Sequence, residues 1–125
     1  MVARLQNKIA LVVGAGSIGP GWGNGKATAV LFAREGAKVI CADVKENAAN
    51  ETFQIIREEN GMANAVRADV TSHGDIRRMV EACMDLYGRI DVVDYNVGLA
   101  HVGGVVELPE EEWDWIFAVN LKAAF

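Results

Sequence analysis

Residues 11–26, LVVGAGSIGPGWGNGK, decide the fold of this chain. An apolar run passes directly into a loop dense in glycine, and residues that favour a helix follow the loop. Glycine leaves the backbone N–H groups of such a turn uncovered, so that a diphosphate can approach them and the positive end of the helix. The stretch therefore predicts a strand, a nucleotide-binding loop and a helix in succession.

Strand and helix patterns alternate along the whole chain. Apolar, β-rich runs predict strands at 8–13, 38–43, 64–68 and 90–93. Apolar residues at helical spacing predict helices at 24–35, 45–60 and 110–125, and another between a cap at Ser72 and a stop at Gly88. Short connections between such elements imply parallel strands joined by right-handed crossovers. We expect one domain over residues 1–125, a Rossmann-type, doubly wound α/β sheet with helices on both faces.

Composition and charge exclude several classes of function. The net charge is −5, which argues against nucleic acid or an anionic membrane as the main partner. No apolar run approaches the roughly 20 residues that span a bilayer, and the N-terminus lacks the pattern of a cleaved signal. Cys41, Cys83 and the two histidines show no metal-ligand spacing. We therefore expect buried, reduced thiols, no metal site and a cytoplasmic location.

The glycines of the loop can be aligned in two registers. The first, Gly14-x-Gly16-x-x-Gly19, is the general dinucleotide fingerprint, whose third glycine lies inside a helix that has already begun. Here Pro20 and three more glycines follow. Each glycine in a helix interior costs about 1 kcal/mol relative to alanine, so a helix at this point is disfavoured.

The second register agrees with the physics of the helix. Gly14, Gly23 and Gly25 are then the functional glycines, residues 18–22 are an insertion that lengthens the loop, and the helix begins near Asn24. With that register the chain resembles the short-chain dehydrogenase/reductase family, whose pattern is G-x-x-x-G-x-G. Further sequence motifs that resemble those of the family follow in the family's order and spacing: FAREGAKVICADV (32–44), RADVT (67–71), GRIDVVDYNVG (88–98) and EEWDWIFAVNLKAAF (111–125).

The resemblance implies a topology and an activity. The four strands, numbered along the chain, would lie in the order 3-2-1-4 and form part of the nucleotide fold. Family members transfer a hydride between a nicotinamide dinucleotide and a small alcohol or carbonyl substrate, which are the expected partners. The family's catalytic serine and Tyr-x-x-x-Lys are not found here, because Tyr87 is followed four residues later by Asp91 and Tyr95 by Leu99.

Asp43 indicates which dinucleotide is bound. It ends the second expected strand, about twenty residues beyond the glycine loop. A carboxylate at this point accepts hydrogen bonds from both hydroxyls of the adenosine ribose and repels a 2′-phosphate, which favours NAD over NADP. A helix N-cap is the alternative role for Asp43, and the nearby Lys45 leaves some tolerance for a phosphate.

Further cofactor-binding residues are implied by the resemblance. They lie in the glycine loop and after the third and fourth strands: Gly14, Ser17, Gly23, Asn24, Gly25, Asp69, Val70, Asn96 and Gly98. Asp69 and Val70 would flank the adenine, although a turn aspartate before Thr71 is the alternative. Ser17 either donates its hydroxyl to a phosphate or fills the turn. Lys26 lies in the first turn of the helix, where a cation is unfavourable unless an anion binds nearby.

The end of the fourth strand departs from the family. The usual Asn-Asn-Ala-Gly is replaced by YNVG at 95–98, and Asp94 stands where an apolar residue is usual. An aspartate buried without a partner is costly, so Asp94 is either partnered or lines an opening. Asn120 matches the family's active-site asparagine, whose backbone carbonyl holds a water in the proton relay to the catalytic lysine. It is the one catalytic position that we expect in these residues.

Three functions are compatible with this sequence. The first is an NAD-dependent oxidoreductase of the short-chain family, present as a truncated chain that is weakly active or inactive alone. The others are a dinucleotide-binding module without catalysis and a self-assembling structural remnant. A fourth strand without its usual neighbour would leave an apolar edge open, so we expect a homo-oligomer with strand 4 or helix 4 at the contact.

Overall fold

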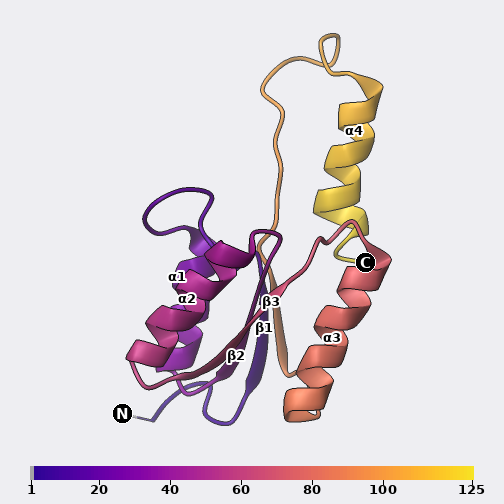
Figure 1. The fold of residues 1–125 in the computed structure, drawn as a ribbon. Helices are drawn as coiled ribbons and strands as arrows, with labels where there is room; N and C mark the ends of the chain where they lie inside the picture. Colours follow the sequence, from indigo (N-terminus) through magenta and orange to yellow (C-terminus); the bar gives the residue numbers. More distant parts are fainter. Residues whose placement is uncertain (1) are drawn as a thin grey trace.

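The computed structural model describes residues 2–125 and shows a parallel sheet covered by helices (Figure 1). The elements follow one another as β1 (Ile9–Val13), α1 (Asn24–Arg34), β2 (Lys38–Asp43), α2 (Glu46–Glu58), β3 (Met62–Arg67), α3 (His73–Tyr87), β4 (Val92–Tyr95), α4 (Glu110–Phe117) and a π-helical turn (Ala118–Lys122). The strand order is β3-β2-β1-β4 and every pairing is parallel, which confirms the expected topology.

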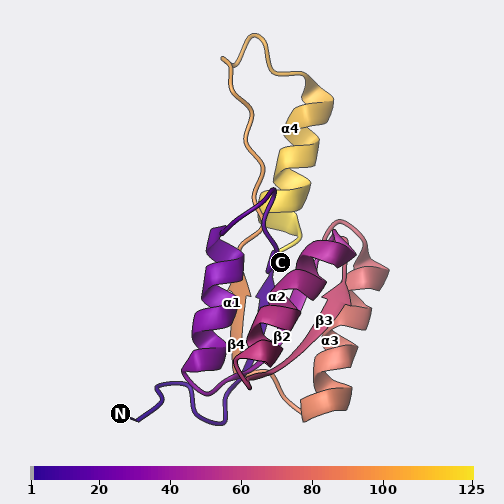
Figure 2. The same cartoon turned by 60° about the vertical axis from the view of Figure 1, so that its left-hand side comes forward.

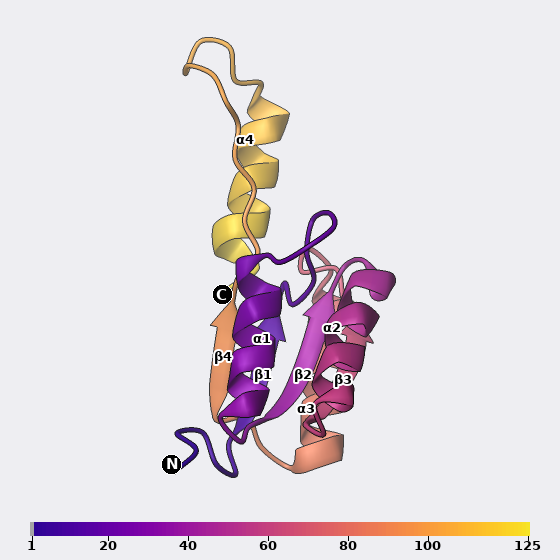
Figure 3. The same ribbon diagram turned by 90° about the vertical axis from the view of Figure 1, so that its left-hand side faces the viewer.

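The two central strands are buried on both faces. All five residues of β1 and the four inner residues of β2 are buried. Helices cover both sides of such strands, which is why they carry continuous apolar runs. On one face, Val12 packs with Val30 of α1 and Ile56 of α2. On the other face, Leu11 packs with Met79 of α3. Figure 1 shows the two helical layers on either side of the sheet, and Figure 3 shows α1 and α2 in front of it.

Local signals set the ends of the helices. Helix α1 begins at Asn24, as the second glycine register predicts. The Ser72 hydroxyl caps α3 by accepting a hydrogen bond from the Asp75 N–H at 3.2 Å. Gly88 ends that helix with φ +74°, a left-handed conformation that suits glycine. These boundaries depend on neighbouring residues alone, so the sequence predicts them well.

The bounds of the fourth strand differ from the prediction. β4 spans Val92–Tyr95, two residues later than expected, because it pairs with β1 from Ala10↔Val92 to Val13↔Tyr95. Asp91 precedes the ladder, where its carboxylate accepts a hydrogen bond from the Ile9 N–H at 2.8 Å. The partner strand therefore sets the limits of β4, and its own apolar run does not.

The last helix, expected as one helix over 110–125, changes from α-helical to π-helical hydrogen bonding after Phe117. Helix α4 ends at Phe117, and the Ala123 N–H then donates to the Ala118 carbonyl, five residues earlier. The Tyr95 hydroxyl donates to the Val119 carbonyl within this turn, and a side chain inserted in this way disturbs the regular helical ladder. α4 and the segment before it project beyond the carboxyl ends of the strands (Figure 2).

Candidate dinucleotide site

The expected site residues gather at the carboxyl edge of the sheet. Gly14 follows β1, Asp43 ends β2, Asp69 follows β3 and Asn96 follows β4. Ligands of open parallel sheets bind at this edge, at the point where the strand order reverses. That point lies between β1 and β4, beside the glycine loop.

The start of α1 lies directly against the turn after β1. A Cβ on Gly25 would come within 1.8 Å of the Gly14 carbonyl oxygen, which no side chain allows. Gly14 itself has φ +85°, and a Cβ there would lie 3.0 Å from the Asn96 carbonyl oxygen. The N-cap, Gly23, offers no side-chain cap, and the first turn of α1 has no acidic residue. The first N–H groups of α1 are therefore suited to an anion such as a diphosphate. We call this start of α1, together with Gly14 and Gly25, the glycine cradle.

Gly16 is a residue that sequence reasoning set aside and the structure requires. A Cβ on Gly16 would lie 2.4 Å from the Ala48 Cβ, and its N–H donates to Asp43 Oδ2 at 3.0 Å. A Cβ on Gly23 would meet nothing nearer than 3.7 Å, so no protein atom demands glycine there. The first register contained the signal for Gly16. Helix propensity predicts the start of α1 correctly, but the need for glycine at position 16 comes from packing against α2.

The Asp43 carboxylate is held at the end of β2 by backbone groups. Oδ2 accepts from the Gly16 N–H and Oδ1 from the Lys45 N–H, both at 3.0 Å. Lys45, and not Asp43, is the N-cap residue of α2, so the N-cap role is wrong. Each carboxylate oxygen keeps acceptor capacity, which the hydroxyls of a ribose can use.

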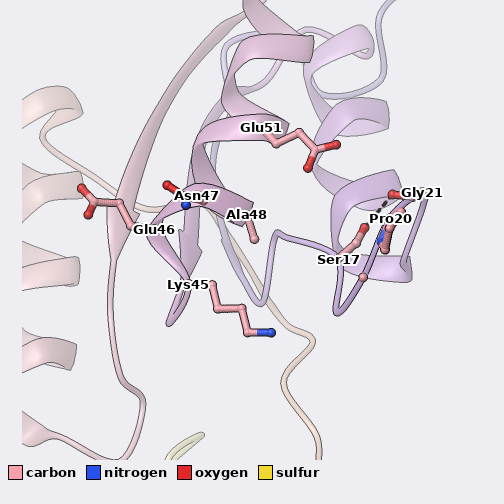
Figure 4. Close-up of a pocket in the computed structure, with 9 residues that line it drawn as sticks. Ser17, Pro20, Gly21, Lys45, Glu46, Asn47, Ala48 and Glu51 are labelled. Atoms are coloured by element: carbon pink, nitrogen blue, oxygen red, sulfur yellow. Dashed lines mark hydrogen bonds between the residues drawn. The ribbon is translucent and has the colours of Figure 1, made fainter.

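Ser17 closes the glycine loop on itself. Its hydroxyl donates to the Gly21 carbonyl at 2.9 Å and accepts from the Gly23 N–H at 3.0 Å. The single hydroxyl proton is therefore engaged within the loop, as the turn-filling alternative predicts. A cavity of about 720 Å³ lies between this loop and the start of α2, and residues such as Pro20, Ala48 and Glu51 line it (Figure 4).

Asp69 forms a tight turn after β3. Its Oδ1 accepts hydrogen bonds from the Thr71 N–H at 2.9 Å and the Thr71 hydroxyl at 2.6 Å. These bonds lower the pKa of Asp69, which keeps the carboxylate ionised at neutral pH. The Asp69 N–H donates to Asp75 Oδ2 at 2.9 Å, and Val70 lies in the core below. β2 separates this turn from the strand that carries the glycine loop.

Asn120 ties the π-helical turn to the segment after Gly98. Its side-chain amide donates to the Leu99 carbonyl and its Oδ1 accepts from the Leu99 N–H, both at 2.8 Å. After this turn, the N–H groups of Ala123 and Phe125 donate to the carbonyls of Ala118 and Leu121. Among residues 2–125, neither of these bonds uses the Asn120 carbonyl, which is the group that the family resemblance assigns to a relay water.

Asp94 is partly buried, and the expectation that its carboxylate is fully partnered is wrong. This residue pairs in register with Val12, and its Oδ2 is buried without a hydrogen-bond partner among the described residues. A buried, unpaired polar atom costs free energy, so this oxygen destabilises β4.

Comparison with known proteins agrees with this geometry. Residues 8–125 match the family model described as short chain dehydrogenase. The chain belongs to this family. It is 40% identical to the 3-oxoacyl-(acyl-carrier-protein) reductase FabG of Thermotoga maritima, and the match covers 98% of this chain and 48% of that protein. The chain therefore spans about half the length of the curated relatives it matches.

Solved structures show the same relation. A protein from Burkholderia xenovorans assigned to the short-chain dehydrogenase/reductases superposes with a TM-score of 0.93 at 43% identity. The match covers 98% of this chain and 49% of the Burkholderia chain. A hydroxysteroid dehydrogenase from Escherichia coli has a TM-score of 0.88 at 28% identity, covering 97% and 49%. Members of this family are oxidoreductases that bind nicotinamide dinucleotides. Among residues 2–125, no helix has the length and apolar character to cross a bilayer.

Proposed function

We propose that this chain is the dinucleotide-binding part of an NAD-dependent short-chain oxidoreductase acting on an alcohol or carbonyl compound. The observation that carries the proposal is the position of Asp43 beside the glycine cradle, with its carboxylate aligned by the N–H groups of Gly16 and Lys45. An anion at this place repels a 2′-phosphate and accepts from ribose hydroxyls. The buried, free thiols of Cys41 and Cys83 fit the proposed cytoplasmic location.

Different residues of the chain bind different parts of the dinucleotide in this proposal. Gly14 and Gly25 let the first turn of α1 approach the diphosphate, and Asp43 orients the adenosine ribose. Asp69, Val70, Asn96 and Gly98 line the proposed path of the cofactor along the edge of the sheet. NAD, when bound, supplies the carbon that accepts or gives the hydride. We assign to the Asn120 carbonyl the role of holding a water for the proton relay.

Titration calorimetry with NAD and NADP tests the choice of cofactor. We expect NAD to bind more tightly than NADP. The variant Asp43→Asn keeps the shape of the side chain and removes its charge. In this variant we expect the dissociation constant for NADP divided by that for NAD to fall by about tenfold.

The matched control is Glu58→Gln, which removes a charge from the exposed far end of α2. This variant leaves the ratio unchanged if the effect of Asp43 is local. Equal binding of NAD and NADP to the unaltered chain would contradict the preference for NAD.

Hydride transfer requires groups that these 125 residues do not contain, because neither tyrosine is followed by lysine four residues later. We therefore propose that the chain alone binds dinucleotide with little or no turnover. An alcohol panel with NAD, followed by absorbance near 340 nm, tests this point. Turnover that Asp43→Ala abolishes would contradict it and would require another acid–base group.

We also propose that the chain self-associates through α4. Trp113, Trp115 and Phe117 are each about half exposed on this projecting helix, and such apolar surface favours a partner. Light scattering at micromolar concentration is expected to give a mass above the monomer, and Trp115→Glu is expected to lower it. Leu86→Glu on α3 is the control, with a similarly exposed apolar residue. A monomer in the unaltered chain would contradict self-association.

A further inference from the structure

The inserted residues 18–22, which we name the lip, contribute Gly19, Pro20 and Gly21 to the lining of the cavity beside α2 (Figure 4). The lip has little packing of its own, since the Ile18 side chain is 96% exposed and a Cβ on Gly19 or Gly21 would meet nothing within 4 Å. A glycine-rich segment of this kind loses much backbone entropy when it is ordered. Its position therefore needs a specific restraint.

Lys26 of α1 restrains the lip through a hydrogen bond to its backbone. Although it is a lysine, the residue is only 3% exposed. Its Nζ donates to the Gly21 carbonyl at 3.1 Å and to Glu51 Oε1 at 2.6 Å. It also lies 5.2 Å from the centroid of the Trp22 ring, within range of a cation–π interaction.

Two of the three N–H donors of the Lys26 ammonium group are used within the protein, by the Gly21 carbonyl and by Glu51 Oε1. The side chain as a whole is only 4% exposed, so the lip, Trp22 and Glu51 cover the ammonium group. Lys26 is therefore a positioning residue, which acts through the lip and does not need to touch a ligand.

We propose that Lys26 and Glu51 form an anchor that holds the lip against α2 and so sets how tightly the chain retains a dinucleotide. The second half of this statement rests on the proposed function. A loop that is ordered before its ligand arrives loses less entropy on binding, so the anchor lowers the cost of enclosing the diphosphate. Without Glu51 the buried ammonium loses its counter-charge, which is unfavourable and releases the lip.

Hydrogen exchange of the ligand-free chain tests the anchor itself. Glu51→Gln and Lys26→Met are expected to speed exchange of the Gly23 amide, which donates to Ser17, by about tenfold. Arg34→Met and Glu59→Gln are the matched controls, because they break another ion pair between α1 and the end of α2, with a 2.6 Å contact remote from the lip. Exchange that is unchanged in the two anchor variants, or equally faster in the controls, would overturn the anchor.

Binding kinetics test the link to the dinucleotide. In Glu51→Gln the dissociation constant for NAD is expected to rise about fivefold through faster dissociation, with the association rate nearly unchanged. A lip that exchanges faster while NAD dissociates at the original rate would overturn this link. If the unaltered chain binds no NAD, the proposed function and the link both fail, whereas the ligand-free exchange still decides the anchor.

Discussion

Some glycines of the loop are required because a neighbouring atom occupies the space that a Cβ would need. Gly25 touches the backbone of the turn after β1, Gly16 touches α2, and Gly19 faces open space. The loop therefore contains glycines that packing requires and glycines that give only flexibility. The two kinds cannot be distinguished by their spacing.

Replacing Gly25 with alanine tests this distinction. The new methyl group would overlap the Gly14 carbonyl, and only a shift of α1 could relieve the overlap. We expect the free energy of unfolding to fall by about 3 kcal/mol, measured by urea denaturation. The control is Gly19→Ala, for which we expect a change within about 0.5 kcal/mol. Equal losses in the two variants would show that the contact is not decisive.

Residue types alone predicted part of the site. The start of α1, the cap at Ser72 and the placement of Asp43 at a strand end followed from local chemistry. Lys26 did not, because a lysine in a first helical turn is normally solvated. Its burial depends on Glu51, which is 25 residues away in the sequence.

At the scale of elements, β4 carries an unfavourable feature that only the structure defines. Asp94 lies opposite Val12, with one oxygen buried and unpaired among residues 2–125. We expect Asp94→Val to raise the free energy of unfolding by about 1 kcal/mol, because valine favours strands and carries no charge. Asp94→Asn retains a polar atom and should give a smaller gain. A loss of stability in Asp94→Val would mean that the carboxylate is stabilised.

At the scale of the whole molecule, three aspartates that accept hydrogen bonds couple folding to pH. The Thr71 side chain lowers the pKa of Asp69, the Asp69 N–H that of Asp75, and the Ile9 N–H that of Asp91. Because the folded pKa lies below the unfolded value of about 3.9, each group stabilises the fold above that pH. The contribution is lost as the pH falls through the lowered pKa.

Urea midpoints measured from pH 7 to pH 2 check this coupling. We expect them to be nearly constant above about pH 5 and to fall below about pH 4. Asp91→Asn should flatten the decline, because it removes the carboxylate that accepts from Ile9. Asp85→Asn changes an exposed aspartate of α3 and should leave the decline as it was. Identical profiles in the Asp91 variant and the unaltered chain would contradict the assignment.

The sequence by itself determined the strand–helix alternation, the parallel topology, the family and the first residue of α1. These depend on local propensity, on apolar runs and on the steric cost of glycine in a helix. The tertiary structure decided the requirement for Gly16, the change to π-helical bonding after Phe117, the unpaired oxygen of Asp94 and the Lys26–Glu51 anchor. Each of these depends on atoms brought together from distant parts of the chain, so its energy exists only once the elements have packed.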